Sequence, residues 1–181
     1  MKQYSIIKAT KEIFPYILDV LRMLLGNSIE IKEKENYFII KHSAIEETEF
    51  EATIKSLEED LNTLISYYQT GTERSFKEVA MIEDSMAHLP YGHYSLKSII
   101  PQITSRKVKN EVFHFITDGL GLNENIIYAM ADQDLNVSKA SNQLFMHRNT
   151  LLYKIDRFNE LRGFDLKRFH DLYLLIYLLK A

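Results

Sequence analysis

The stretch from Asn136 to Phe158 constrains the fold of this 181-residue chain more than any other. Its small and apolar residues recur at intervals of three and four, which is the period of a helix that buries one face. Two such runs stand only a few residues apart, so the pattern predicts two short helices joined by a tight turn. The first run consists of Val137, Ala140, Ser141 and Leu144, and the second of Leu151, Ile155 and Phe158.

The second predicted helix opens with polar and basic side chains that its packing does not need. Arginine suits guanine O6 and N7 or a phosphate, and asparagine suits adenine N6 and N7. A hydroxyl and the free amides of a helix start suit a phosphate. These features are typical of a helix-turn-helix whose second helix enters the major groove of DNA. The residues that we expect to contact DNA are His147, Arg148, Asn149, Thr150, Tyr153 and Lys154.

The expected roles of these six residues differ. Arg148 would read a base edge or hold a phosphate beside one, with His147, Asn149 and Tyr153 as secondary contacts in the groove. Either His147 or Asn149 could also cap the helix. Thr150 and Lys154 would hold phosphate.

The turn between the two helices departs from the usual pattern. Phe145 stands where many such motifs carry glycine, so the turn must either avoid a positive φ or accept some strain. Met146 is suited to filling the corner between the helices. On spacing alone, an ordinary helical hairpin would show the same pattern.

The segment from Leu135 to Ala181 resembles the C-terminal DNA-binding module of PucR/CdaR-type transcriptional regulators. The resemblance rests on the Asn136-Val137 start, on the block HRNTL at 147–151, on the pattern Leu161-x-Gly163-x-Asp165-Leu166 and on the leucine-rich end. The core of this segment is also similar to the DNA-binding end of the nucleoid protein Fis. A weaker resemblance extends back to about Gly119, where residues 120–134 would supply a preceding helix.

The resemblance implies a transcriptional regulator that binds duplex DNA, with a small metabolite or an upstream domain as effector. It also implies a regulatory α+β body before the DNA-binding module, sometimes similar to a degenerate GGDEF domain. The chain contains no Gly-Gly pair, so it lacks a nucleotide-cyclase signature. The effector itself is not defined by the sequence.

The charge distribution agrees with a nucleic-acid partner. From Asn136 onward the chain has eight Lys and Arg against four Asp and Glu, whereas the whole chain has 22 against 25. A basic end on an acidic body is typical of a protein that places only that end on phosphates. A monomer with so small an excess of cations would bind DNA weakly. We therefore expect a homodimer on adjacent half-sites.

Composition excludes several other classes of protein. The chain has no cysteine, which excludes a disulfide scaffold, cysteine-based zinc sites and thiol catalysis, and is compatible with the cytoplasm. Charged residues interrupt the N-terminal stretch too early for a signal peptide, and no apolar run is long enough to span a membrane. No nucleotide-binding or hydrolase motif is present, so we expect no cofactor.

The N-terminal part predicts a helix, a β-hairpin and further helices. A helix is expected over Thr10–Leu25, strands over 28–33 and 37–41, a helix that opens at Thr48 with Glu51 in a capping box, and another over Thr72–Met86. The expected class is therefore α+β, mainly α, with a body over residues 1–115 and a helix-turn-helix domain over 116–181.

A heptad-like seam continues along the helix that opens at Thr48. It supports either pairing between two subunits or packing on the hairpin of the same subunit, and the second is favoured because a sheet must be covered. Its members are Phe50, Ile54, Leu57, Leu61, Leu64 and Tyr68.

Two rival functions remain. An enzyme could use Asp84 and His88, four residues apart on a helix, with His93 as a third metal ligand, but this spacing matches no zinc signature. A solvated helix end explains His88 as well, so we expect no metal. Alternatively, the helix-turn-helix could bind a protein rather than DNA. Such an apolar contact would be insensitive to salt.

Overall fold

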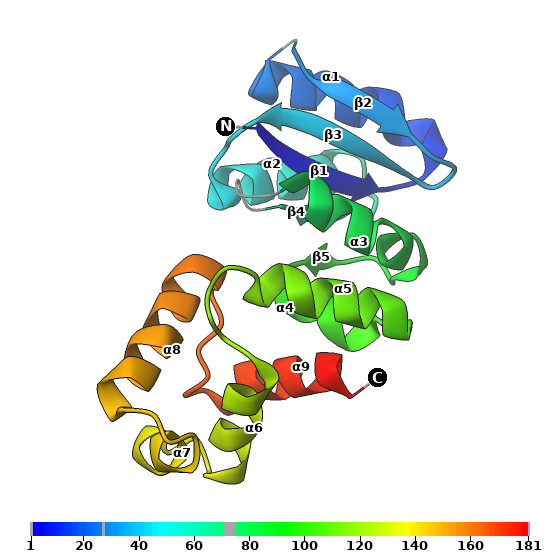
Figure 1. Ribbon diagram of the computed structural model, residues 1–181. Coiled ribbons are helices and arrows are strands. Elements are labelled where there is room, and N and C mark those ends of the chain that lie inside the picture. Colours follow the sequence, from blue (N-terminus) through cyan, green and yellow to red (C-terminus); the bar gives the residue numbers. More distant parts are fainter. Residues whose placement is uncertain (1, 27, 71–74, 181) are drawn as a thin grey trace. The chain divides into compact units, whose positions relative to one another are not determined.

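The structure is a computed structural model that describes residues 2–26, 28–70 and 75–180 (Figure 1). The chain forms two compact units, which we call the N-terminal unit (Met1–Gln102) and the C-terminal unit (Ile103–Ala181). The boundary predicted between residues 115 and 116 falls inside helix α5 (Arg106–Thr117). This helix packs against α9 (Phe169–Leu179), so the C-terminal unit begins ahead of it.

The N-terminal unit is built on a five-stranded sheet of order β2-β3-β1-β4-β5. Strand β1 (Lys2–Lys8) lies at its centre and pairs antiparallel with both β3 (Tyr37–Ser43) and β4 (Ser66–Gln69). Strand β2 (Glu30–Glu33) extends the sheet beyond β3, and β5 (His93–Tyr94) runs parallel to β4. The order β1-α1-β2-β3-α2-β4 along the chain is that of the split βαβ, or ferredoxin-like, motif.

Helices cover both faces of this sheet. Helix α1 (Phe14–Leu25), entered through the 3-10 turn η1 (Lys11–Ile13), and α2 (Glu47–Asp60) share an apolar core with Ile7, Phe38 and Ile40. Side chains alternate along a strand, so the residues next to Ile7, Phe38 and Ile40 point to the opposite face of the sheet. There α3 (Ser75–His88) contacts β1, and its Glu83 accepts a hydrogen bond from the hydroxyl of Tyr37 at 3.0 Å. The short α4 (Leu96–Ile99) and η2 (Ile100–Gln102) end the unit.

The predicted hairpin is confirmed, because β2 and β3 pair antiparallel around residues 34–36. The predicted α-helix from Thr10 is also found, although its α-helical part begins at Phe14 and ends at Gly26 with φ +83°. The central strand β1 was not predicted. Thr72, where a further helix was expected to begin, lies outside the described residues, and α3 starts at Ser75.

The heptad-like seam is wrong beyond residue 60. Helix α2 ends at Asp60, Leu64 is 64% exposed, and Tyr68 lies in strand β4. A positive φ of 46° at Asn62 turns the chain away from the helix axis. The part of the seam that is helical (Phe50, Ile54, Leu57) packs into the unit's own core, as favoured. The predicted capping box is also wrong, because the helix begins at Glu47, ahead of Thr48, without a side-chain cap.

His42 on β3 forms a buried polar pair with Ser5 on β1. Its Nδ1 lies 2.6 Å from the Ser43 carbonyl oxygen, and its Nε2 lies 2.9 Å from Ser5 Oγ. A carbonyl only accepts, so Nδ1 carries the proton and Nε2 accepts from the serine hydroxyl. Both side chains are fully buried. A serine–histidine pair closed to substrate is structural rather than catalytic.

Because His42 is buried in this pair with Ser5, we expect the protein to lose stability in mild acid. Burial lowers the pKa of folded His42 below its ordinary value of 6.5. Between these two pKa values the unfolded chain binds more protons, so the stabilisation is complete above pH 6.5 and is lost as the pH falls through the folded pKa. Urea denaturation from about pH 8 to about pH 5 should show this decrease in the free energy of unfolding, and His42→Gln should reduce it. An unchanged pH profile in the variant would contradict this role.

The C-terminal unit consists of helices packed around one another. Helix α5 is followed by α6 (Glu124–Asp132), α7 (Val137–Gln143), α8 (Arg148–Arg162) and α9. Helix α9 contacts both α5 and α6, α6 contacts α7, and α7 contacts α8. The expected helix before the helix-turn-helix is therefore confirmed as α6. The chain is α+β, mainly α, as predicted, and within the described residues no helix is long and apolar enough to cross a membrane.

Candidate nucleic-acid interface

Helix α7 begins at a side-chain cap and buries two small residues. The side chain of Asn136 accepts the Lys139 N–H at 3.1 Å, which satisfies an amide of the first turn. Ala140 and Ser141 are buried, and Ser141 Oγ donates to the Ser138 carbonyl at 2.9 Å. These small residues let α8 cross closely, as the spacing predicted.

The turn between α7 and α8 has a positive φ at a bulky residue. Phe145 has φ +50°, so the second of the two alternatives for the turn, strain, is the one adopted. The Phe145 N–H donates to the Asn142 carbonyl at 3.1 Å, and the Met146 N–H donates to the Ser141 carbonyl at 2.9 Å. Met146 is half-buried, whereas the Phe145 side chain is fully exposed.

Helix α8 is amphipathic in the way that a recognition helix requires. Leu151, Ile155 and Phe158 have no exposed surface, so one face is committed to the core. The four residues at its start, His147 to Thr150, are all exposed. Tyr153, one turn further on, is 61% exposed and Lys154 is half-buried. All six predicted contact residues therefore lie at the start or in the first two turns of one helix.

Of the two residues proposed as caps, His147 is the one that caps α8. Its Nδ1 accepts the Asn149 N–H at 3.2 Å. An accepting Nδ1 carries no proton in the neutral ring, so Nε2–H remains as a donor. The capping bond thus fixes the ring at the start of the helix and leaves one donor directed elsewhere.

Arg148 is held by a residue that the sequence did not single out. Its Nε donates to Ser138 Oγ on α7 at 3.0 Å. The guanidinium has five N–H donors in a planar fork, and this bond uses the one at Nε. Both terminal NH₂ groups are therefore free of that bond. A serine ten residues upstream of an arginine has no sequence signature, because the pairing depends on the crossing of α7 and α8.

Two cations on α8 attach this helix to the last turn of α5 and to the connection that follows it. Lys154 Nζ donates to the Gly121 carbonyl at 2.8 Å, and Arg162 Nε donates to the Ile116 carbonyl at 3.2 Å. Gly121 has φ +61°, and a Cβ there would lie 2.5 Å from Lys154 Nζ. Position 121 therefore suits glycine for two reasons, and the bonds fix the position of α8 within its unit.

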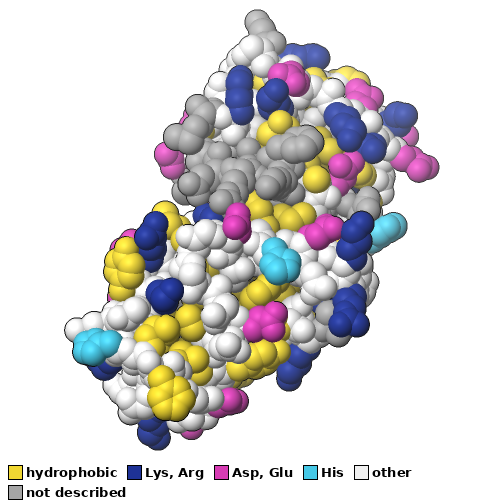
Figure 2. Space-filling model, in the orientation of Figure 1, with side chains coloured by type: hydrophobic (Ala, Val, Ile, Leu, Met, Phe, Trp, Pro, Cys, Tyr) yellow, Lys and Arg dark blue, Asp and Glu magenta, His cyan; other side chains and the backbone are white. Residues whose placement is uncertain are grey.

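Basic residues form no continuous patch on the face that Figure 2 shows. On the face in view, Figure 2 shows Lys and Arg side chains distributed among acidic and apolar ones in both units. On α8, Arg157 donates to the Tyr153 hydroxyl at 3.2 Å. Lys167, which follows the helix, forms an ion pair with Asp156 on it at 2.8 Å. The ion pair offsets one positive charge beside α8.

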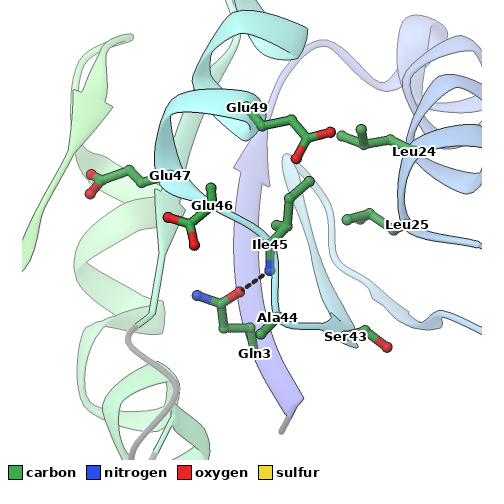
Figure 3. Close-up of a pocket in the computed structure, with 9 residues that line it drawn as sticks. All are labelled: Gln3, Leu24, Leu25, Ser43, Ala44, Ile45, Glu46, Glu47 and Glu49. Carbon is green, nitrogen blue, oxygen red and sulfur yellow. Dashed lines mark hydrogen bonds between the residues drawn. The ribbon is translucent and has the colours of Figure 1, made fainter.

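A hollow of about 620 Å³ in the N-terminal unit has a different character (Figure 3). Leu24, Leu25 and Ile45 contribute apolar surface, and Gln3 accepts the Ile45 N–H at 2.9 Å. Its other lining residues include three carboxylates, Glu46, Glu47 and Glu49. These would repel phosphates, so the hollow is unsuited to nucleic acid.

The alternative metal cluster is not supported by the described residues. His93 Nε2 faces Glu58 Oε2 at 3.6 Å, and the side chain of Asp84 lies outside the described part. Among the side chains that the structure describes, no three His, Cys, Asp or Glu are placed to hold a metal ion together.

The crossing of α7 and α8, with the exposed start of α8, defines the C-terminal unit as a helix-turn-helix domain. Residues 125–181 match the family model of the PucR C-terminal helix-turn-helix domain, so the C-terminal unit carries a domain of that family. This confirms the resemblance seen in the sequence, and it supports a role in transcription regulation. The match covers about a third of the chain.

Among solved structures, that of a bacterial regulator is similar to the chain over almost its whole length. It is the crystal structure of a regulator of polyketide synthase expression from Bifidobacterium adolescentis, with a TM-score of 0.52 and 15% sequence identity. The similarity covers 98% of this chain and 78% of that one. At this identity the likeness shows the fold. No curated protein matches the chain in sequence.

Proposed function

We propose that the chain is a sequence-specific, DNA-binding transcriptional regulator that places helix α8 in the major groove and acts as a homodimer. The proposal rests chiefly on the start of α8, where the four side chains from His147 to Thr150 are exposed while the opposite face of the helix is buried. The family of the C-terminal domain agrees with this proposal. In this account the protein works in the bacterial cytoplasm and has no catalytic role.

Arg148 is the principal base-reading residue in this proposal. Ser138 takes up Nε, so the two terminal NH₂ groups form an end-on fork that matches guanine O6 and N7. Asn149 would meet an adenine edge, and the Nε2–H of His147 would reach a base or a phosphate. Thr150 would donate to a phosphate beside the helix start.

Tyr153 and Lys154 would contact the DNA backbone beside the base-reading residues at the start of α8. The Tyr153 hydroxyl accepts from Arg157, which leaves its own O–H as a donor to the DNA backbone. Lys154 has three N–H donors, and the Gly121 carbonyl takes one of them. The other two would hold phosphate, so this residue would both position α8 and contact DNA.

The charge of the C-terminal segment supports a dimer. The segment from Asn136 onward has an excess of four positive charges, and the N-terminal remainder of the chain is acidic. Two copies on adjacent half-sites would double the phosphate contacts and the base contacts. The operator is then expected to contain two related half-sites about 10 base pairs apart, or a multiple of that spacing.

Ser138→Ala is expected to weaken specific binding about 3- to 10-fold, because Arg148 must then lose more conformational freedom when it binds. The change should leave the melting temperature within about 2 °C, since Ser138 is exposed. Fluorescence anisotropy with the preferred duplex measures the loss. In the Arg148→Ala background the serine substitution should add nothing further, and a full additional loss there would contradict the positioning role.

The alternative function is a protein-interaction module that reuses the helix-turn-helix. The exposed Phe145 and Tyr153 beside the start of α8 favour it. Salt distinguishes the two functions, because neutralised phosphates release counterions and an apolar protein contact does not. We expect binding to a random-sequence duplex to fall at least tenfold between about 50 and about 200 mM salt. Absence of DNA binding at low salt would favour the alternative.

A further inference from the structure

We propose that Phe145 is a DNA-contact residue, and that its ring lies against apolar groups of the duplex when α8 occupies the major groove. The proposal rests on the function proposed above and adds an apolar contact to its polar ones. Duplex DNA offers two kinds of apolar group at a groove, the C5-methyl of thymine and the carbons of the deoxyribose.

The side chain of Phe145 contributes no packing to the fold. Its exposed fraction is 100%, the highest among the large apolar residues that the structure describes. The next is Met23 on α1, at 87%. A fully exposed phenyl ring gains none of the stabilisation that burial of an aromatic side chain provides.

The backbone at Phe145 also disfavours this residue. Its φ of +50° lies in the left-handed region, where a Cβ crowds the neighbouring carbonyl and where glycine or asparagine is accommodated more easily. The local conformation would therefore be more stable with either of those residues. Neither packing nor backbone geometry accounts for phenylalanine here, which indicates a function outside the isolated chain.

The position of Phe145 favours an anionic partner. It precedes the cap of α8, His147, by two residues, and the exposed cations Lys139 and Arg148 lie on the two helices that flank the turn. The hydrogen bond from its N–H to the Asn142 carbonyl fixes the backbone of the turn, so only the side-chain torsions of Phe145 need ordering on binding. An apolar group set among cations at a helix start suits a polyanion that also has apolar surface, and duplex DNA has both.

The test compares the full-length wild type with Phe145→Gly and Phe145→Asn. Both variants remove the ring and accept a positive φ, so their melting temperature is expected to rise by about 2 °C. Their affinity for the duplex that the wild type enriches from a random pool is expected to fall roughly tenfold. Met23→Gln is the matched control, since it removes an exposed apolar side chain from the other unit and should leave DNA affinity unchanged.

Four outcomes decide the proposal. Weaker DNA binding by variants of equal or greater stability supports it. Unchanged DNA affinity overturns it and leaves the proposed function standing. A melting temperature lower by more than about 5 °C in both variants overturns it as well, because the ring would then stabilise the fold. If the wild type binds no duplex at low salt, the proposed function fails and this inference fails with it.

A second measurement identifies the apolar group. Replacing thymine by uracil in the enriched duplex removes the C5-methyl and keeps every hydrogen-bonding group. A loss of affinity that is seen with the wild type and not with Phe145→Gly supports contact with thymine methyl groups. Equal affinity of the wild type for both duplexes, with the variant still weaker on each, supports contact with the sugar.

Discussion

The Arg148→Ala protein is expected to bind its preferred duplex about 1–3 kcal/mol more weakly than the wild type, which is roughly a 5- to 150-fold loss. The loss is expected because the end-on fork of Arg148 is the strongest base-reading group on α8. The fold should be unaffected, since Arg148 is exposed and its described bond is to the equally exposed Ser138. Fluorescence anisotropy with the preferred duplex and with a random duplex measures the specific and the non-specific affinity.

Two matched variants separate base reading from charge. Arg148→Lys keeps the positive charge and loses the planar fork, so it should retain binding to the random duplex and lose most of the preference. Arg22→Ala removes an exposed cation from α1 and should change neither measurement. If Arg148→Ala kept the full preference for one sequence, Arg148 would have no base-reading role.

Ala140→Leu is expected to destabilise the C-terminal unit by about 3 kcal/mol or to unfold it. Ala140 has no exposed surface and lies on α7, which packs against both α6 and α8. Three additional carbon atoms at this position would push the two helices apart. Chemical denaturation followed by circular dichroism measures the loss, and DNA binding should fall with it because the position of α8 changes.

Asn142→Leu is the control for this substitution. It places the same side chain on the exposed side of α7, two residues further along, and should change stability by less than about 0.5 kcal/mol. An Ala140→Leu protein with wild-type stability and wild-type DNA affinity would contradict the helix register described here.

The C-terminal unit was largely predictable because its signals are local. The spacing of Leu151, Ile155 and Phe158 gave the buried face of α8, and all three have no exposed surface. The possible caps were visible as residue types, and the structure selected His147. The order HRNTL then placed the exposed polar residues, because the face opposite a buried stripe is the solvent face.

The N-terminal unit was less predictable because its sheet depends on partners far apart in the sequence. Strand β1 has little alternation, and its pairing with β3 and β4 joins residues that are between 29 (Lys8 and Tyr37) and 64 (Ser5 and Gln69) positions apart. Tyr68 continued the spacing of α2 by chance and lies in β4. The bonds from Arg148 to Ser138 and from Lys154 to Gly121 were missed for the same reason, since each depends on how α8 packs against segments distant in the sequence.

The most direct test of the central claim is selection of binding sites from a pool of random duplex DNA. Wild type and Arg148→Ala are compared at two salt concentrations, about 50 and about 200 mM. We predict that the wild type enriches a motif with two related half-sites, and that Arg148→Ala loses this enrichment. Salt-sensitive binding without any enriched motif, or no binding at the lower salt concentration, would contradict a sequence-specific DNA-binding regulator.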